Sequence, residues 1–137
     1  MTGEETIAAL FADWEVGRID AIVSRFATDA IWHFSAGTKP PAVGHAAIAS
    51  FLRGYAAIAS GSKIQILRTA QSGDTLFFEA SDRFQAGGRS VVVPYAGVVS
   101  FRDGLILDWR DYFDRVLVDG PGTLPGFAHS LLARPGQ

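Results

Sequence analysis

The sequence predicts an α+β domain, with helices early in the chain and a run of strands after them. Apolar residues recur at helical spacing over most of the first 58 residues. From Lys63 onward they recur at every second residue, which is the period of a β-strand. Short glycine-containing segments then separate four strand-like runs. At 137 residues, with 48% hydrophobic content, the chain is about one domain long and can bury a sizeable core.

The N-terminal elements follow from helix signals. Thr2 and Glu5 fit a capping box, and Gly17 is placed to end the helix. Its apolar stripe consists of Ile7, Leu10, Phe11 and Trp14. A short second helix is expected over about residues 19–26. A strand is expected in "DAIWHFS", where Ala30, Trp32 and Phe34 alternate.

The remaining elements are a loop, a helix and a meander. "GTKPPAVG" reads as a loop, and the next segment, "HAAIASFLRGYAAI", carries Ile48, Phe51, Leu52 and Tyr55 at helical spacing. Four strands are expected in "KIQILRTA", "TLFFEASDRF", "RSVVVPYAGVVSF" and "LILDWRDYFD", joined by the hairpin turns "QSGD", "QAGG" and "RDG". We expect one domain over residues 1–137, with a C-terminal tail from about residue 120.

Composition argues against several function classes. The net charge of −2 leaves no basic stripe for nucleic acid. The chain has no cysteine for disulfides or thiolate metal sites, and His33, His45 and His129 form no metal-binding pattern. No apolar stretch approaches the roughly 18 residues that a membrane span needs. We therefore expect a soluble cytoplasmic protein without metal, other cofactor, nucleic-acid partner or membrane partner.

Two aspartates interrupt apolar strand faces. In "LILDWRDYFD", period two puts Asp111 on one face with Leu105, Leu107, Trp109 and Phe113. In "TLFFEASDRF", Asp82 shares a face with Leu76, Phe78, Ala80 and Phe84. Burying an unpaired carboxylate costs several kcal/mol, so each aspartate needs either structural donors or a function. If both line one concavity, they can share a proton or divide into an acid and a base.

A family resemblance agrees with the second interpretation. "SDRFQAGGRSVVVPYAGVVSFRDGLILDWRDYFD" resembles the C-terminal half of limonene epoxide hydrolases, and "PPAVG" is similar to their proline-rich loop. The resemblance covers most of residues 26–113, and "WRDYFD" is its most specific part. It implies the cone-shaped fold of nuclear transport factor 2, SnoaL-like polyketide cyclases and ketosteroid isomerases. In that fold a curved mixed or antiparallel sheet and the N-terminal helices enclose an apolar pocket.

The resemblance also implies roles for the two aspartates. Asp111 matches the family's general base, which activates water, and Asp82 matches the acid that protonates the epoxide oxygen. The family's bridging arginine is replaced by Ala80, and its water-holding tyrosine and asparagine are replaced by Trp32 and Phe34. Arg68 shares a strand face with Ile64 and Ile66, so it is either a substitute cation that reaches the pair or an arginine at the rim. The positions that would be catalytic in a ketosteroid isomerase hold Leu10, Phe34 and Ala96.

Two classes of function stay open. The first is a cofactor-free acid/base enzyme acting on a small apolar molecule, by epoxide hydrolysis or by SnoaL-like cyclisation, isomerisation or elimination. The second is a non-catalytic module for small-molecule binding or dimerisation. A homodimer is expected through the back of the sheet, where Phe77 and Tyr112 face outward. The residues expected to bind substrate are Trp14, Trp32, Phe34, Phe84, Val93, Tyr95 and Phe113, although Tyr95 is as compatible with a core position.

Overall fold

The computed structural model describes residues 1–119 and confirms the α+β class. The helices are α1 (Gly3–Glu15), α2 (Ile19–Ser24), α3 (Gly44–Ile58) and α4 (Val116–Asp119). The strands are β1 (Phe26–His33), β2 (Ala42–Val43), β3 (Ser60–Ser72), β4 (Thr75–Ala86), β5 (Arg89–Arg102) and β6 (Leu105–Tyr112). The tail expected from about residue 120, with His129, lies outside the described residues.

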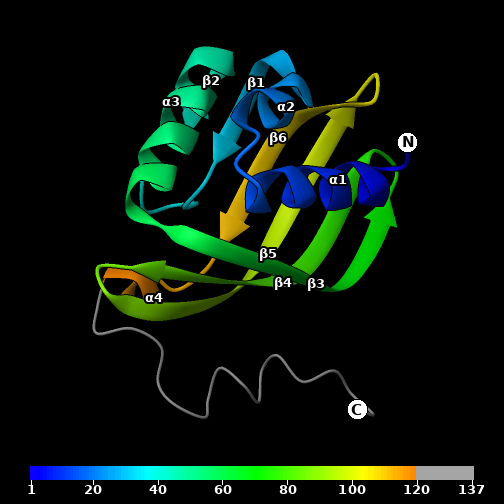
Figure 1. Cartoon of the computed structure of the whole chain (residues 1–137). Helices are drawn as coiled ribbons and strands as arrows, with labels where there is room; N and C mark the ends of the chain where they lie inside the picture. The colour runs from blue at the N-terminus through cyan, green and yellow to red at the C-terminus, as the bar shows by residue number, and fades with distance from the viewer. Residues whose placement is uncertain (120–137) are drawn as a thin grey trace.

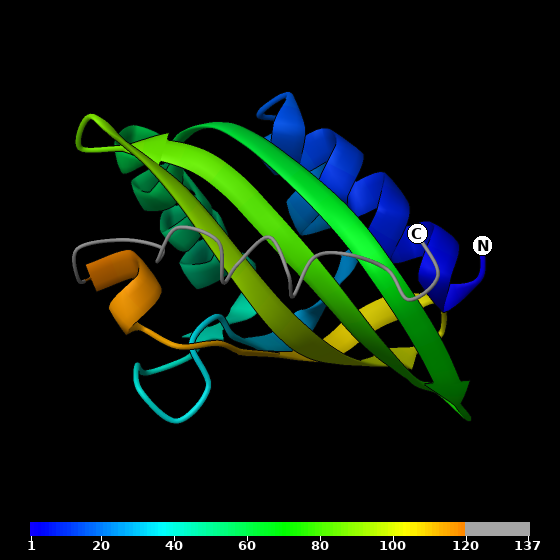
Figure 2. The ribbon, with the colours of Figure 1, turned by 90° about the horizontal axis from the view of Figure 1, so that it is seen from below.

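The strands form one mixed sheet in the order β2-β1-β6-β5-β4-β3. Strands β3 to β6 make the expected antiparallel meander, and β1 joins β6 in parallel. Strand β5 therefore lies between β4 and β6, which carry Asp82 and Asp111. The helices α1, α2 and α3 lie on one side of this sheet (Figure 1). From below, the long strands β3, β4 and β5 curve across the molecule with α1 and α3 behind them (Figure 2).

The first helix begins as its capping box predicts. Thr2 Oγ1 accepts the backbone N–H of Glu5 at 3.1 Å, and the Glu5 carboxylate accepts the backbone N–H of Thr2 at 3.4 Å. These two bonds satisfy donors that the helix itself leaves unpaired. The apolar stripe, including the fully buried Ile7 and Leu10, then faces the core. Trp14 is thereby placed at the end of α1 that reaches the cavity described below.

Some boundaries differ from the prediction. Helix α2 ends at Ser24, because Phe26 is buried and begins β1 opposite Ile106 of β6. The expected loop contains the short strand β2, which pairs with β1 through Val43 and Ile31. Strand β3 starts at Ser60, three residues earlier than expected. No helix within residues 1–119 has the length and apolar character needed to cross a membrane.

Candidate active site

A cavity of about 540 Å³ lies among the inner sheet face, α1, α3 and the segment after β6. Both Asp82 and Asp111 line it. The structure places all seven residues expected to bind substrate in the same lining: Trp14, Trp32, Phe34, Phe84, Val93, Tyr95 and Phe113. The volume falls within the range of pockets that bind small organic molecules.

Several aromatic lining residues were not anticipated. Phe11, Phe51, Tyr55 and Trp109 also contribute to the wall. Phe11 belongs to the same helical stripe as Trp14, and Phe51 and Tyr55 are one turn apart on α3, so helical spacing was the available signal. The rings contact one another, as in the Trp14–Tyr55 pair, whose centroids are 5.1 Å apart. The wall is therefore a connected set of aromatic side chains.

Asp111 sits deep in this wall between two indole rings. Its Oδ1 accepts the Nε1–H of Trp109 at 2.7 Å, and its Oδ2 accepts the Nε1–H of Trp32 at 3.2 Å. The residue is 8% exposed, and burial raises the pKa of Asp111 to about 7 while the two indole donors lower it in part. An aspartate with a pKa near neutrality can gain or lose a proton under ordinary conditions.

Asp82 occupies a different environment on β4. The Tyr55 hydroxyl donates to its Oδ2 at 3.1 Å, whereas its Oδ1 is buried and accepts no hydrogen bond from any group within residues 1–119. Burial raises the pKa of Asp82 to about 6, an effect that the nearby hydroxyls of Tyr55 and Ser62 partly offset. The nearby Glu15 carboxylate raises this pKa further. The free Oδ1 is the atom of Asp82 that remains available to a ligand.

The two carboxylates do not contact each other directly. On β5, Asp82 pairs with Val93 and Asp111 pairs with Gly97, so the aspartates are offset by four residues, roughly 13 Å along the strand. Burial, rather than repulsion between the two charges, is the main cause of both raised pKa values. Of the two alternatives, a shared proton or a division into an acid and a base, this separation favours the second, with two separate carboxyl groups facing one cavity.

Tyr95 lies between them on β5. It pairs with Ala80, the position where the resembling family has its bridging arginine, and its side chain packs against the core that includes Ala80. Burial and the charges of Asp111 and Asp82 raise the pKa of Tyr95 well above its ordinary value. The phenol consequently stays protonated near neutral pH. Because Tyr95 lines the cavity, its protonated hydroxyl can donate a hydrogen bond to a bound molecule.

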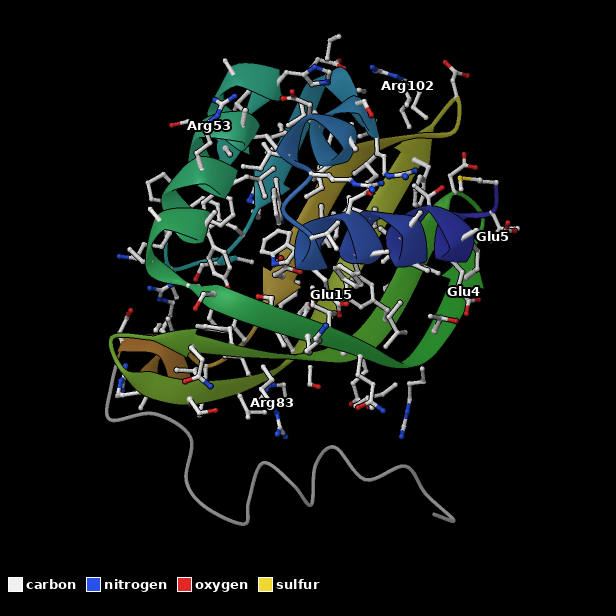
Figure 3. All side chains as sticks on the ribbon, in the orientation of Figure 1. Glu4, Glu5, Glu15, Arg53, Arg83 and Arg102 are labelled. Atoms are coloured by element: carbon white, nitrogen blue, oxygen red, sulfur yellow. The ribbon has the colours of Figure 1, made fainter. Side chains whose placement is uncertain are left out.

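Arg68 is not part of this site, which corrects one expectation. The register of β3 against β4 shifts between Ile66 and Arg68, so Ile66 pairs with Ala80 but Arg68 pairs with Glu79. This irregularity turns Arg68 to the outer face of the sheet, where its Nε lies 3.4 Å from a carboxylate oxygen of Glu79. Another outer-face residue, Arg83 of β4, points away from the helices in Figure 3.

The cationic side chains that line the cavity, Lys39 and Arg115, are not buried. Lys39 is exposed, and Arg115 forms an ion pair with Asp119 of α4 at 2.7 Å. The Arg115 guanidinium also lies 5.7 Å from the centre of the Phe113 ring. Within residues 1–119, no buried cation faces Asp82 or Asp111 in the cavity wall.

Comparison with solved structures confirms the fold. An LEH-like epoxide hydrolase of M. tuberculosis superposes with a TM-score of 0.71 at 24% identity, over 80% of each chain. A hypothetical protein of Catenulispora acidiphila, with a ketosteroid isomerase-like fold and solved in complex with trimethylamine, gives 0.75 at 22% identity over 82% of this chain and 88% of that one. An NTF2-like protein of unknown function from Burkholderia pseudomallei superposes with a TM-score of 0.75 at 19% identity, over 83% of this chain and 92% of that one.

These neighbours share the NTF2-like arrangement of N-terminal helices and a mixed sheet. The family model described as "SnoaL-like domain" matches residues 7–109, which span α1 to the middle of β6. That range includes Asp82 and the indole partners of Asp111. The chain therefore belongs to the SnoaL-like domain family.

Proposed function

We propose that the protein is a cofactor-free acid/base enzyme acting on a small apolar molecule, and that epoxide hydrolysis is its reaction. One observation carries the proposal: two buried carboxyl groups with raised pKa values face one cavity whose wall is otherwise mainly apolar. Burying two carboxylates costs stability, and perturbed pKa values concentrate at functional sites. Their separation leaves room for a substrate to lie between them.

In this reaction ionised Asp111 is the general base and protonated Asp82 is the general acid. Because the pKa of Asp111, about 7, exceeds that of Asp82, about 6, this reactive form is the less populated of the two singly protonated forms. The ionised Asp111 carboxylate takes a proton from water as the water oxygen bonds to an epoxide carbon. The carbon–oxygen bond of the ring breaks, and Asp82 gives its proton to the oxygen that leaves the carbon. The product is a diol, and proton exchange with solvent returns both aspartates to their starting states.

Tyr95 is the group best placed to assist. Tyr95 lies on β5 between the residues that pair with Asp82 and Asp111, and its hydroxyl stays protonated, so it can donate a hydrogen bond to the water or to the epoxide oxygen. Trp32 stands where the resembling family holds its water with a tyrosine, and here its indole N–H donates directly to Asp111. The similarity in fold to the M. tuberculosis epoxide hydrolase supports testing this reaction first.

A second reaction uses the same residues without water. Both oxygens of Asp111 already accept indole donors, and Phe34 stacks on Phe51 with ring centres 4.0 Å apart, so polar groups near the base are few. This environment favours a base that removes a proton from a substrate carbon. Isomerisation, elimination or cyclisation would follow, with Asp82 or Tyr95 protonating the developing oxyanion.

The test is turnover of a panel of small apolar epoxides in ¹⁸O-labelled water. Hydrolysis predicts diols that carry one labelled oxygen, and both Asp82→Asn and Asp111→Asn should lose the activity. Asp29→Asn, which changes an exposed aspartate on β1, is the matched control and should keep it. For the second reaction, the panel is extended to small cyclic ketones in deuterated water. Asp111-dependent uptake of deuterium without diol would support proton abstraction, whereas no turnover of either class would favour a binding module.

A further inference from the structure

The candidate site has an unbalanced charge. Asp82 and Asp111 are both buried, yet neither faces a buried cation among the described residues. Ala80 supplies no charge between them, and Arg68 lies outside with Glu79. A buried carboxylate is stabilised either by binding a proton or by a cation that enters the site.

Asp82 is the carboxylate that can accept such a cation. Both oxygens of Asp111 are occupied by the indole donors of Trp109 and Trp32. In contrast, Asp82 is 9% exposed and its Oδ1 has no hydrogen-bond partner within residues 1–119. A buried acceptor without a donor is unfavourable, and a ligand N–H would satisfy it.

The rings around Asp82 suit a positive group. Trp14, Tyr55 and Phe84 line the cavity next to it, and the Tyr55 ring centre lies 5.1 Å from that of Trp14 and 5.7 Å from that of Phe84. Aromatic faces attract organic cations, most strongly where water is excluded. The Glu15 carboxylate adds negative charge near this end of the cavity, and Figure 3 shows Glu15 at the end of α1.

We propose that the cavity binds a small apolar amine as its ammonium ion, with an ammonium N–H donating to Asp82 Oδ1. The carbon skeleton of the amine then packs along the aromatic wall toward Asp111. The ammonium takes the place of the missing buried cation, and its hydrogen bond pairs the free oxygen of Asp82. This inference gives a ligand class to the cavity of the proposed enzyme, but amine binding requires no catalytic step.

The pH dependence of binding follows from the groups around Asp82. They are Glu15 on α1, Tyr55 on α3, Lys63 on β3, Tyr95 on β5 and, further along the cavity, Asp111 on β6. Lys63 faces Glu15 with 3.8 Å between the charged atoms, and both tyrosines stay neutral near pH 7. Asp82 is therefore the group next to the proposed ammonium that changes charge near pH 6.

The experiment compares benzylamine with benzyl alcohol, which has nearly the same shape but no charge. Binding is measured calorimetrically at pH 8, and we expect benzylamine to bind roughly tenfold to a hundredfold more tightly. In Asp82→Asn the two ligands should bind about equally. The matched control, Asp29→Asn, changes an exposed aspartate outside the cavity and should keep the preference for the amine, and circular dichroism checks that both variants are folded.

A second measurement uses the wild type alone, so its result does not depend on whether the variants fold. Near pH 6, benzylamine binding should displace a proton from Asp82, so the binding enthalpy should depend on the ionisation enthalpy of the buffer, whereas that of benzyl alcohol should not. Equal affinities for the two ligands, undetectable amine binding, or a preference that survives in Asp82→Asn would overturn the proposal. Epoxide turnover is measured in a separate assay. The amine-binding proposal can therefore fail while the proposed enzyme activity holds, and the reverse.

Discussion

The indole Nε1–H of Trp32 donates to Asp111 Oδ2 at 3.2 Å, although 79 residues separate the two in sequence. The contact depends on the parallel pairing of β1 with β6, which places Trp32 beside Trp109. Trp109 then reaches Asp111 Oδ1 from two residues away on the same strand face. The parallel pairing thus gives one carboxylate two fixed donors and restrains its orientation.

Replacing one of the indole donors should shift the pKa of Asp111. In Trp32→Phe the carboxylate loses a hydrogen bond that favours its ionised form, so the pKa of Asp111 should rise above about 7. The limb of the pH–rate profile on which activity increases with pH should move to higher pH. Trp14→Phe is the control, since its indole donates to Ser62 and not to Asp111. Identical profiles for wild type and Trp32→Phe would contradict this role.

The stability of the fold should depend on the same carboxyl group. The folded-state pKa of Asp111, about 7, exceeds its ordinary value of 3.8, so the folded protein holds this proton more tightly than the unfolded chain. Its contribution to stability is therefore largest below about pH 4 and decreases until about pH 7. Asp111→Asn removes this dependence, which amounts to about 1.4 kcal/mol per pH unit for one proton.

Chemical denaturation at pH 4, 5.5 and 7 measures the effect. The free energy of unfolding of wild type, minus that of Asp111→Asn, should decrease at each increase in pH. Taking the difference cancels titrations common to both proteins. A constant difference over the three pH values would show that Asp111 titrates normally in the folded state.

The Phe78 ring leaves no room for a side chain at position 97. A Cβ placed on Gly97 would lie 2.2 Å from the Phe78 ring, which itself packs edge-on against Trp109. Gly97→Ala should thus cost about 1–3 kcal/mol of stability by overpacking. Gly54→Ala is the control, because a Cβ there meets no atom within 4 Å and alanine favours the helix. Equal thermal stability of the two variants would contradict the predicted clash.

The outer sheet face is the expected homodimer surface. Phe77 and Tyr112 are 45% and 50% exposed there, which leaves apolar area that a partner could bury. Phe77→Arg should convert a dimer to a monomer in sedimentation equilibrium, since a charge at the centre of an apolar interface is costly. Val43→Arg, on the edge strand β2, should leave the dimer intact. A monomeric wild type would rule out this surface as a dimer interface.

Strand periodicity predicted much of the site. A period of two puts Asp82 and Asp111 on apolar faces, and the meander then brings those faces to one side of the sheet. The same rule fails at Arg68, because one irregularity in the β3–β4 register reverses every side chain beyond it. Alternation within one strand contains no information about such a shift.

The partners of the aspartates were harder to predict. Tyr55 reaches Asp82 from α3, and no local pattern indicates which strand residue a helix side chain will meet. Trp109 offered a clearer signal, because residues two apart on a strand share a face and an indole N–H needs an acceptor when buried. The pairing of Trp32 with Asp111 required the order of the strands, which the sequence pattern left open.

The most direct test of the acid/base proposal is the turnover of Asp111→Asn. On any epoxide that the wild type hydrolyses, or any carbon acid that it deprotonates, turnover should fall by about 10² to 10⁴ across pH 5 to 8, because the amide cannot accept the proton. Circular dichroism and thermal unfolding confirm that the variant is folded. Turnover equal to that of wild type in the folded variant would show that Asp111 is not the base and would contradict the proposed function.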